Sequence, residues 1–394
     1  MLYINFYTAV KNSCMMSRKK ICFVVASPST ADSFMRDHIA ALQSEYDVYL
    51  AGNITSKDEV GRLDINGWQQ IDIMRPISLI NDLKAVFQLR RYFKKMQFDA
   101  VHSITPKAGL VCALGSWLAG VKHRTHIYTG QVWATRKGLM RWLLMACDKV
   151  TAVFDNHILV DGEPQRQFLI KNHITTPRKS KVLGAGSISG VNTVRFTPSE
   201  EVRNDIRRQL NIGKDDIVFC FMGRQNAEKG IYELYDAFNR LASEFSNVTL
   251  LMYGSDEEGC MNHLPKYGNI KQGDNFIFYG NTPTPERHLQ GADVFCMPSY
   301  REGFGSSVIE ASCLGLPVIC SDAYGLQDTM VDNETGLRCK VADATSLYDA
   351  MKYYVENRSE GIKHGANGRA RVLKYFAGEE ITKHWVEWYR SILN

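Results

Sequence analysis

The segment that decides how the chain is read is Pro298-Ser-Tyr-Arg-Glu-Gly-Phe-Gly-Ser-Ser-Val-Ile-Glu310. An apolar run over 292–297, typical of a buried strand, precedes it, and residues 311–316 continue its end as a helix. Gly303 and Gly305 allow a sharp turn and a close approach of the backbone to a ligand. Because the N–H groups at a helix start have no partner within the helix, they can receive an anion or a sugar hydroxyl. The segment therefore predicts a strand, a loop that holds an oxygen-rich ligand, and a helix.

Two carboxylates, Glu302 and Glu310, lie within this segment. Glu302 precedes the helix and Glu310 lies inside it, so both can line one wall of a cleft and accept hydrogen bonds from two sets of hydroxyls. By spacing alone, two solvated carboxylates are an equally good interpretation, because Asp and Glu supply 42 of the 394 residues. The surrounding sequence has to decide between these interpretations.

The surrounding residues resemble the donor-site motif of the family 4 retaining glycosyltransferases, which have the GT-B fold. The resemblance covers 299–311 and continues through 315–319 and 333–337. It is strong over 217–340 and looser over 18–190. It implies an α/β protein of the GT-B type, with two Rossmann-like parallel-sheet domains that face a central cleft.

The length of the chain agrees with two domains, since 394 residues divide into two units of roughly 180 to 200 residues. Strand-like and helical runs alternate in both halves, which is typical of parallel sheets with helices on both faces. We expect an N-terminal acceptor-side domain over 17–190 and a C-terminal nucleotide-sugar-binding domain over 191–375. Residues 376–394 are expected to form a helix that crosses back to the first domain, and residues 1–16 an extension.

Composition excludes several classes of protein. The formal net charge of +5 is only mildly basic, so no nucleic-acid partner is expected. The ten cysteines contain no Cys-x2-Cys pair and read as reduced packing residues. The apolar run over 21–26 is short for a signal peptide, and the run over 110–121 falls well below the ~20 residues that span a bilayer. No transmembrane helix is expected.

A second candidate loop, Gly223–Gly230, follows the predicted strand 217–222 and opens a helix. It places Arg224, Lys229 and a helix N-terminus together, an arrangement that attracts a diphosphate. A basic solvated turn is the simpler alternative. The resemblance favours the diphosphate, since the family pattern Gly-Arg...Lys-Gly is met here.

The resemblance also implies a role for each site residue. Arg224 and Lys229 would stabilise the leaving diphosphate, Glu310 would accept hydrogen bonds from the ribose, and Glu302 with the Phe304 and Gly305 amides would hold the donor sugar. The expected catalytic residues are Glu302, Arg224 and Lys229. The expected donor-binding residues are Gly223, Arg224, Lys229, Thr282, Glu302, Gly303, Phe304, Gly305 and Glu310.

On the acceptor side, the loop Thr129–Trp133 is the most distinctive of those that follow strands of the first sheet. Trp133 either stacks on a sugar face or fills the interface between the domains. His126 is either a core histidine or a group on the acceptor side. Family members often carry a His near position 129, and Thr129 stands in its place. The expected acceptor-side residues are Thr129, Gln131, Trp133 and His126.

No metal and no other cofactor is expected. The sequence contains no Asp-x-Asp, so the two cations of the Gly223–Gly230 loop would neutralise the leaving group. It also contains no Gly-x-Gly-x-x-Gly, which weakens a nicotinamide-binding interpretation.

The predicted function is that of a retaining glycosyltransferase. It would move a hexose or N-acetylhexosamine from a nucleotide sugar, expected to be UDP-linked, to a lipid-linked or surface-polysaccharide acceptor such as a glycan on undecaprenyl diphosphate. The alternative within the same fold is a sugar-nucleotide 2-epimerase, which needs no acceptor. A non-catalytic sugar-binding or scaffold protein would be favoured if Arg224, Lys229 or Glu302 were missing, and all three are present.

The predicted helix 79–96 is basic and amphipathic. Its basic residues are Lys84, Arg90, Arg91, Lys94 and Lys95. The simpler interpretation is a solvated helix face. The alternative is contact with anionic lipid, aided by Trp142 and its apolar neighbours if they are exposed on the same side. We therefore expect a cytoplasmic protein that associates peripherally with the inner face of the cell membrane.

Overall fold

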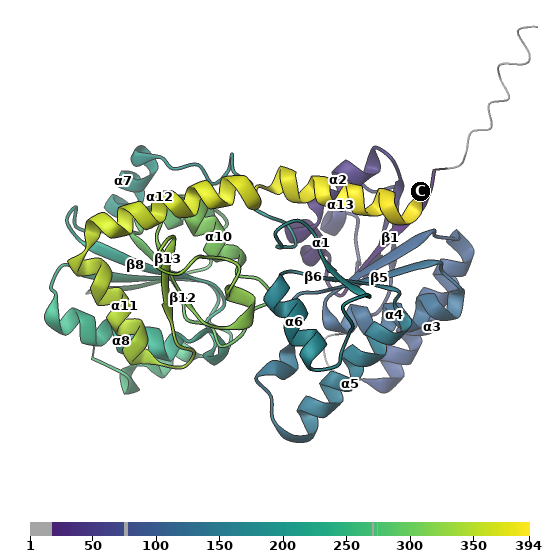
Figure 1. Ribbon diagram of the computed structural model, residues 1–394, viewed down its shortest axis with the longest axis horizontal. Helices are drawn as coiled ribbons and strands as arrows, with labels where there is room; N and C mark the ends of the chain where they lie inside the picture. The colour runs from purple at the N-terminus through teal and green to yellow at the C-terminus, as the bar shows by residue number, and fades with distance from the viewer. Residues whose placement is uncertain (1–17, 75–77, 270–271, 274) are drawn as a thin grey trace, which may run out of the picture.

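The structure is a computed structural model that describes residues 18–74, 78–269, 272–273 and 275–394. Two α/β domains lie side by side, and helices α12 (Arg358–Tyr375) and α13 (Gly378–Leu393) run along one side of both (Figure 1). The predicted fold class, two Rossmann-like domains built on parallel sheets, is confirmed.

The first domain is built on a seven-stranded parallel sheet in the order β3-β2-β1-β4-β5-β6-β7. Its strands are β1 (Lys20–Val25), β2 (Asp47–Gly52), β3 (Gly67–Gln70), β4 (Ala100–Ile104), β5 (His123–Tyr128), β6 (His157–Val160) and β7 (Ser180–Val182). The central strands read as apolar runs because helices cover both faces of the sheet.

Successive residues of β1 enter different cores. Phe23 packs in the core that contains helix α2, and Val24 packs in the core that contains α3 and α4. The helices of this domain are α1 (Pro28–Phe34), α2 (Arg36–Gln43), α3 (Leu79–Met96), α4 (Pro106–Ala119), α5 (Gly138–Phe154) and α6 (Glu163–Lys171), with short 3-10 turns η1 (Asp58–Val60) and η2 (Val132–Ala134). No helix within the described residues has the length and the apolar character needed to cross a membrane.

The second domain is built on a six-stranded parallel sheet in the order β10-β9-β8-β11-β12-β13, with one continuous core. Its strands are β8 (Ile217–Met222), β9 (Val248–Tyr253), β10 (Phe276–Gly280), β11 (Val294–Met297), β12 (Val318–Ser321) and β13 (Gly336–Cys339). Its helices besides α12 are α7 (Glu200–Gln209), α8 (Ile231–Glu244), α9 (Pro285–His288), α10 (Ser306–Cys313) and α11 (Ala344–Glu356). Its 3-10 turns are η3 (Ala227–Lys229), η4 (Cys260–Asn262), η5 (Leu264–Lys266), η6 (Leu289–Gly291) and η7 (Tyr324–Leu326).

The two segments that cross between the domains are hydrogen-bonded to each other. The Val191 N–H donates to the Phe376 carbonyl at 2.8 Å, and the Gly378 N–H donates to the Val191 carbonyl at 2.8 Å. Gly190 has φ 65°, and a Cβ there would lie 2.7 Å from the Phe376 carbonyl oxygen, so only glycine fits. Helix α13 then packs on the first sheet, where Trp385 and the strand residues share one core.

Candidate active site

The loops that follow β5 and β11 meet backbone to backbone at the interface between the domains. A Cβ on Gly303 would lie 2.3 Å from the Thr129 carbonyl oxygen, and a Cβ on Gly130 would lie 2.9 Å from the Gly303 nitrogen. Neither position has room for a side chain, so the two glycines permit this approach. The structure therefore brings together Gly303 and Thr129, which the sequence assigned to the donor and acceptor sides.

Two crossed ion pairs connect turn η3 to the loop before α10. The Lys229 Nζ lies 2.5 Å from the Glu302 Oε1, and the Arg301 Nη2 lies 2.7 Å from the Glu228 Oε2. The backbone supports this geometry, because Gly230 has φ 71° and a Cβ there would lie 2.3 Å from the Pro298 carbonyl oxygen. The sequence analysis predicted Lys229 and Glu302 as site residues and missed their neighbours Glu228 and Arg301. Each missed residue stands next to a predicted one of opposite charge, and this was the signal that could have identified them.

Arg224 lies in a different environment from Lys229. Its side chain is 58% exposed and its Nη1 lies 3.1 Å from the Glu257 Oε2. Gly223 precedes it, and its N–H donates to the Tyr253 carbonyl at 3.1 Å. Gln225 connects the turn to strand β9. Its side chain is fully buried, and its Nε2 donates a hydrogen bond to the Tyr253 carbonyl at 2.8 Å. Of the two predicted cations, only Lys229 is paired with a predicted site carboxylate.

Phe304 and Gly305 present backbone N–H groups at the start of α10. Within the described part of the chain these two N–H groups have no protein acceptor. The Phe304 ring is buried and packs against Phe376 with ring centroids 5.5 Å apart. The ring anchors the loop beside the crossing segments, and the amides stay available to an anion or a hydroxyl.

Glu310 lines a cavity of about 600 Å³ that both domains form. Pro283 and Ser306 line the same cavity from the second domain. Burial raises the pKa of the Glu310 carboxyl to about 7, while nearby Arg195 lowers it and Glu286 raises it. In its ionised form this carboxylate is an acceptor for hydroxyl groups that enter the cavity. Residues of α1 and α2 and of the loop after η1 face it from the first domain, among them Asp32, Arg36 and Arg62.

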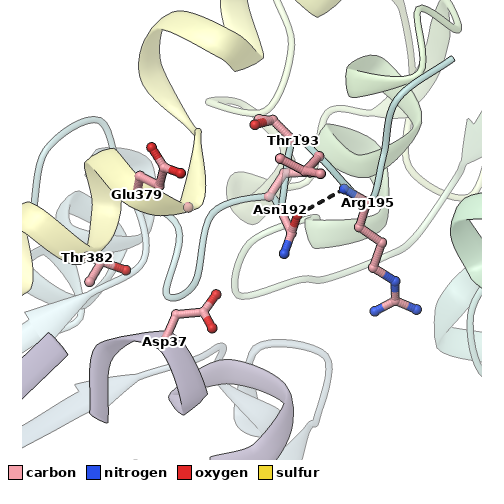
Figure 2. A pocket seen from close by; sticks show the side chains of 9 residues that line it. Asp37, Asn192, Thr193, Arg195, Glu379 and Thr382 are labelled. Carbon is pink, nitrogen blue, oxygen red and sulfur yellow. Dashed lines mark hydrogen bonds between the residues drawn. The ribbon is translucent and has the colours of Figure 1, made fainter. Parts of the chain in front are cut away.

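A second cavity, of about 590 Å³, lies at the crossing segments. Figure 2 shows the side chains that line it. Asp37, Asn192 and Arg195 line both cavities. The Asn192 Oδ1 accepts a hydrogen bond from the Arg195 N–H at 2.9 Å, which closes the turn at this crossing (Figure 2). The predicted catalytic residues Arg224, Lys229 and Glu302 line neither of these two cavities.

Thr282 lies in the turn after β10. Its hydroxyl is 2.9 Å from the His288 Nδ1 and accepts a hydrogen bond from the Thr284 N–H at 3.1 Å. These bonds fix the turn that carries Pro283 into the cavity of Glu310. The Thr282 side chain is therefore engaged in shaping the turn.

Of the two interpretations of His126, the structure agrees with the core histidine. The ring is buried, its Nδ1 lies 2.9 Å from the Ser103 Oγ, and a Cβ on Gly109 would lie 2.5 Å from the ring. Burial lowers the pKa of His126 to about 3, so the ring is neutral. The expectation of an acceptor-side role is corrected, since the ring is enclosed beneath the strand ends.

Trp133 is also enclosed, so no face of its indole is open to a sugar. Its Nε1 donates to the Asp148 Oδ2 at 2.7 Å and its ring stacks on Phe168 at 5.1 Å. Phe168 in turn stacks on Tyr324 of the second domain at 4.4 Å. The sugar-stacking interpretation is therefore replaced by an aromatic stack at the domain interface. Gln131 contributes to the same interface and is fully buried.

No group of three or more His, Cys, Asp and Glu side chains in the described ranges is arranged to hold a metal ion. Charged groups at the domain interface include the two crossed ion pairs.

Two family models match the chain. Residues 202–371 match the model described as Glycosyl transferases group 1, and residues 36–184 match the Glycosyl transferase 4-like domain. The chain is a glycosyltransferase. The first matched range contains all six strands of the second sheet, and the second contains β2 to β7 of the first sheet, so both domains of this glycosyltransferase are matched.

Named relatives of this glycosyltransferase act in capsule and lipid-linked glycan assembly. The capsular polysaccharide biosynthesis glycosyltransferase CapM of Staphylococcus aureus is 28% identical over 96% of this chain and 98% of its own length. The UDP-Gal:alpha-D-GlcNAc-diphosphoundecaprenol alpha-1,3-galactosyltransferase of Escherichia coli is 26% identical over 77% of this chain and 78% of its own length. The chain is thus similar to these enzymes over most of their length.

Solved structures share the GT-B fold of this glycosyltransferase. HepE of Anabaena in complex with UDP-glucose superposes with a TM-score of 0.78 at 17% identity, covering 94% of this chain and 99% of HepE. A glycosyltransferase of Rickettsia africae superposes with a TM-score of 0.78 at 18% identity, covering 96% of this chain and 99% of that structure. At these identities the likeness is one of fold.

Proposed function

We propose that this glycosyltransferase moves a hexose or N-acetylhexosamine from a UDP-sugar to a lipid-linked glycan, with retention of configuration at the sugar. The observation that carries the proposal is the Lys229–Glu302 pair, 2.5 Å apart at the junction of the two domains. A cation and a carboxylate side by side suit a substrate whose leaving diphosphate and sugar hydroxyls are neighbours.

Each residue of the site has a role in the proposed reaction. Lys229 stabilises the negative charge that develops on the leaving diphosphate, and Arg224 adds a more solvated charge. Glu302 accepts hydrogen bonds from the sugar hydroxyls, and the N–H groups of Phe304 and Gly305 donate to the donor. The acceptor hydroxyl attacks from the face that the diphosphate leaves.

The proposed donor is UDP-linked and no metal takes part. Glu310, in the cavity of about 600 Å³, accepts hydrogen bonds from the ribose, and the Pro283 turn faces the base. The name of the Escherichia coli relative and the UDP-glucose bound to HepE support a UDP-sugar. The charge of the leaving group is carried by Lys229 and Arg224, since the sequence has no Asp-x-Asp.

The proposed acceptor is a glycan on undecaprenyl diphosphate, which lies at the membrane surface. Relatives from Escherichia coli and Campylobacter jejuni are named for transfer to sugars linked to this lipid. The relatives described above are all named glycosyltransferases, so the epimerase alternative is not proposed. Incubation with UDP-sugar alone tests this choice, because an epimerase interconverts sugars without an acceptor.

The first domain has a surface suited to that location. Helices α3 and α5 both pack against α4 and both carry exposed apolar side chains. Among them, Leu79, Leu139 and Trp142 are 77%, 85% and 67% exposed. This α3/α5 patch consists of Leu79, Ile80, Leu83 and Phe87 on α3 and Leu139, Met140, Trp142 and Leu143 on α5. Large exposed apolar side chains that gather on one domain are typical of surfaces that contact a membrane or another protein.

Basic residues of α3 accompany the patch, so its proposed partner is an anionic bilayer. Arg91, Lys94 and Lys95 are exposed, and each Lys or Arg near an anionic leaflet contributes about 1 kcal/mol. Apolar side chains beside cations are typical of interfacial helices. We propose peripheral attachment of the first domain to the inner face of the cell membrane.

The donor assignment is tested by thermal shift with UDP, GDP and ADP. A ligand present at 100 times its Kd stabilises the protein by about 2.7 kcal/mol. We expect UDP to raise the Tm most. A larger shift with GDP would contradict the UDP assignment, and transfer to a synthetic lipid-diphosphate sugar then tests the acceptor.

A further inference from the structure

The backbone that carries Glu302 is wedged between two other loops. On one side, a Cβ on Gly325 would lie 2.1 Å from the Glu302 carbonyl oxygen. On the other side, Gly303 is in the close contact with Thr129 and Gly130 described above. The position of Glu302 therefore depends on the separation of a loop of the first domain from turn η7 of the second.

One side chain ties these two loops together. The Tyr324 hydroxyl donates to the Gln131 Oε1 at 2.9 Å and accepts from the Gln131 N–H at 3.2 Å. Tyr324 directly precedes Gly325, and Gln131 directly follows Gly130, so the tie closes a ring around Glu302 and Gly303. The aromatic ring of Tyr324 stacks on Phe168 with the two ring planes 10° apart, and this stack fixes the direction in which the Tyr324 hydroxyl points.

Gln131 is a costly residue for stability alone. It is fully buried, and its Nε2 has no hydrogen-bond partner among the residues that the structure describes. An unpaired buried donor destabilises a fold, so an apolar side chain of similar size would pack here at lower cost. The hydrogen bond that the Gln131 side-chain oxygen accepts from Tyr324 explains why a glutamine is present at this position.

We propose that Tyr324 is a positioning residue for the transfer reaction. Its hydroxyl bond to Gln131 holds the loops of the two domains at the separation that places Glu302 against the donor sugar. The inference rests on the proposed role of Glu302. Tyr324 acts only through the loop that it supports, so the binding of the nucleotide itself does not depend on it.

The test is Tyr324→Phe, which removes the hydroxyl and keeps the stack on Phe168. We expect kcat to fall about 3- to 10-fold, the range for one neutral hydrogen bond, with the Kd for UDP unchanged within twofold. Gln131→Met removes the acceptor from the other domain. If the two residues act through one bond, the double variant loses no more activity than Tyr324→Phe alone.

A matched control is Tyr354→Phe. The Tyr354 hydroxyl is buried and lies 2.9 Å from the His364 Nδ1, within the second domain and away from the cleft. The Tyr354→Phe variant loses a comparable hydrogen bond, but one that is not connected to the Glu302 loop. Its kcat should therefore stay at the wild-type value. Hydrogen exchange of the amides at 302–305 should speed up in Tyr324→Phe and not in the control.

Two outcomes would overturn the inference: full activity of Tyr324→Phe, or additive losses in the double variant. Glu302→Gln separates this failure from that of the proposed site. If Glu302→Gln retains full activity, the role of Glu302 is wrong. If Glu302→Gln is inactive while Tyr324→Phe is not impaired, only the positioning role fails.

Discussion

The ammonium of Lys229 lies 2.5 Å from the carboxylate of Glu302, and both side chains are less than one-fifth exposed. A pair this enclosed interacts more strongly than a surface salt bridge, and removal of one partner leaves the other charge unpaired in a poorly solvated place. Substitution of either Lys229 or Glu302 is therefore expected to have a large effect on the site.

The first prediction concerns Lys229→Ala. We expect kcat/KM to fall about 10- to 150-fold, because a hydrogen bond to a charged group contributes about 1.5 to 3 kcal/mol. The protein should remain folded, with a lower Tm because Glu302 loses its partner. Lys352→Ala is the control, since Lys352 lies 2.7 Å from Glu244 in a pair remote from the cleft. Full activity of Lys229→Ala at limiting and saturating donor would show that the diphosphate assignment is wrong.

The second prediction is a pH-dependent gain in stability for Glu310→Gln. Burial raises the folded-state pKa of Glu310 to about 7, above the ordinary value of 4.5 for a glutamate. The carboxyl therefore binds its proton more tightly in the folded state, and stability is lost as the pH rises from about 4.5 through about 7. Glu310→Gln should raise the Tm at pH 8 and have little effect at pH 4.5.

The same variant should bind UDP more weakly, because a neutral amide replaces the acceptor for the ribose. Isothermal titration at pH 8 measures this loss, expected to be about 10-fold or more. If Glu310→Gln gains stability and keeps its affinity for UDP, the ribose does not bind at Glu310.

The third prediction is that transfer activity survives excess EDTA. Lys229 and Arg224 carry the charge of the leaving group in the proposed mechanism, and a divalent ion has no role. The measurement is the initial rate before and after chelation. An activity that EDTA abolishes and Mg²⁺ or Mn²⁺ restores would refute the metal-free mechanism.

The fourth prediction concerns the α3/α5 patch. Co-sedimentation with anionic liposomes should decrease between low salt and about 0.5 M salt, since surface charges are screened. It should also fall on conversion of four basic residues of α3 to Glu. These residues are Arg90, Arg91, Lys94 and Lys95.

The control carries the same change of charge on the second domain, at exposed lysines outside the patch. These are Lys214, Lys266, Lys340 and Lys363. Trp142→Ser separates the apolar part, and it should weaken binding at high salt as well. Binding that ignores salt and the α3 changes would rule out the electrostatic attachment.

Local sequence was sufficient to predict many of the helices and strands and the two loops that carry Lys229 and Glu302. The helix 79–96 and the strand 217–222 were predicted with the bounds that the structure has, because their apolar periodicity is strong. Lys229 and Glu302 were both placed at the site, since each lies in a loop with its own glycines.

The missed features depend on contacts between distant residues. Tyr324 and Gln131 are 193 positions apart, and neither stands in a pattern that points to the other. A Trp after a strand has the same local sequence whether its ring faces a cleft or a core, so only the structure distinguishes the two for Trp133. Arg301 and Glu228 are missed residues that the sequence could have identified, because each stands next to a charged residue of a predicted motif.

The packing of α13 on the first sheet has a consequence for synthesis on the ribosome. Trp385 and Tyr389 belong to the same core as Ile21 and Phe23 of β1, although more than 350 positions separate them. Domains generally fold in the order in which they emerge, the N-terminal one first. Here the earlier domain lacks part of its core until α13 has left the exit tunnel, so the second domain is free to fold completely before the first one can.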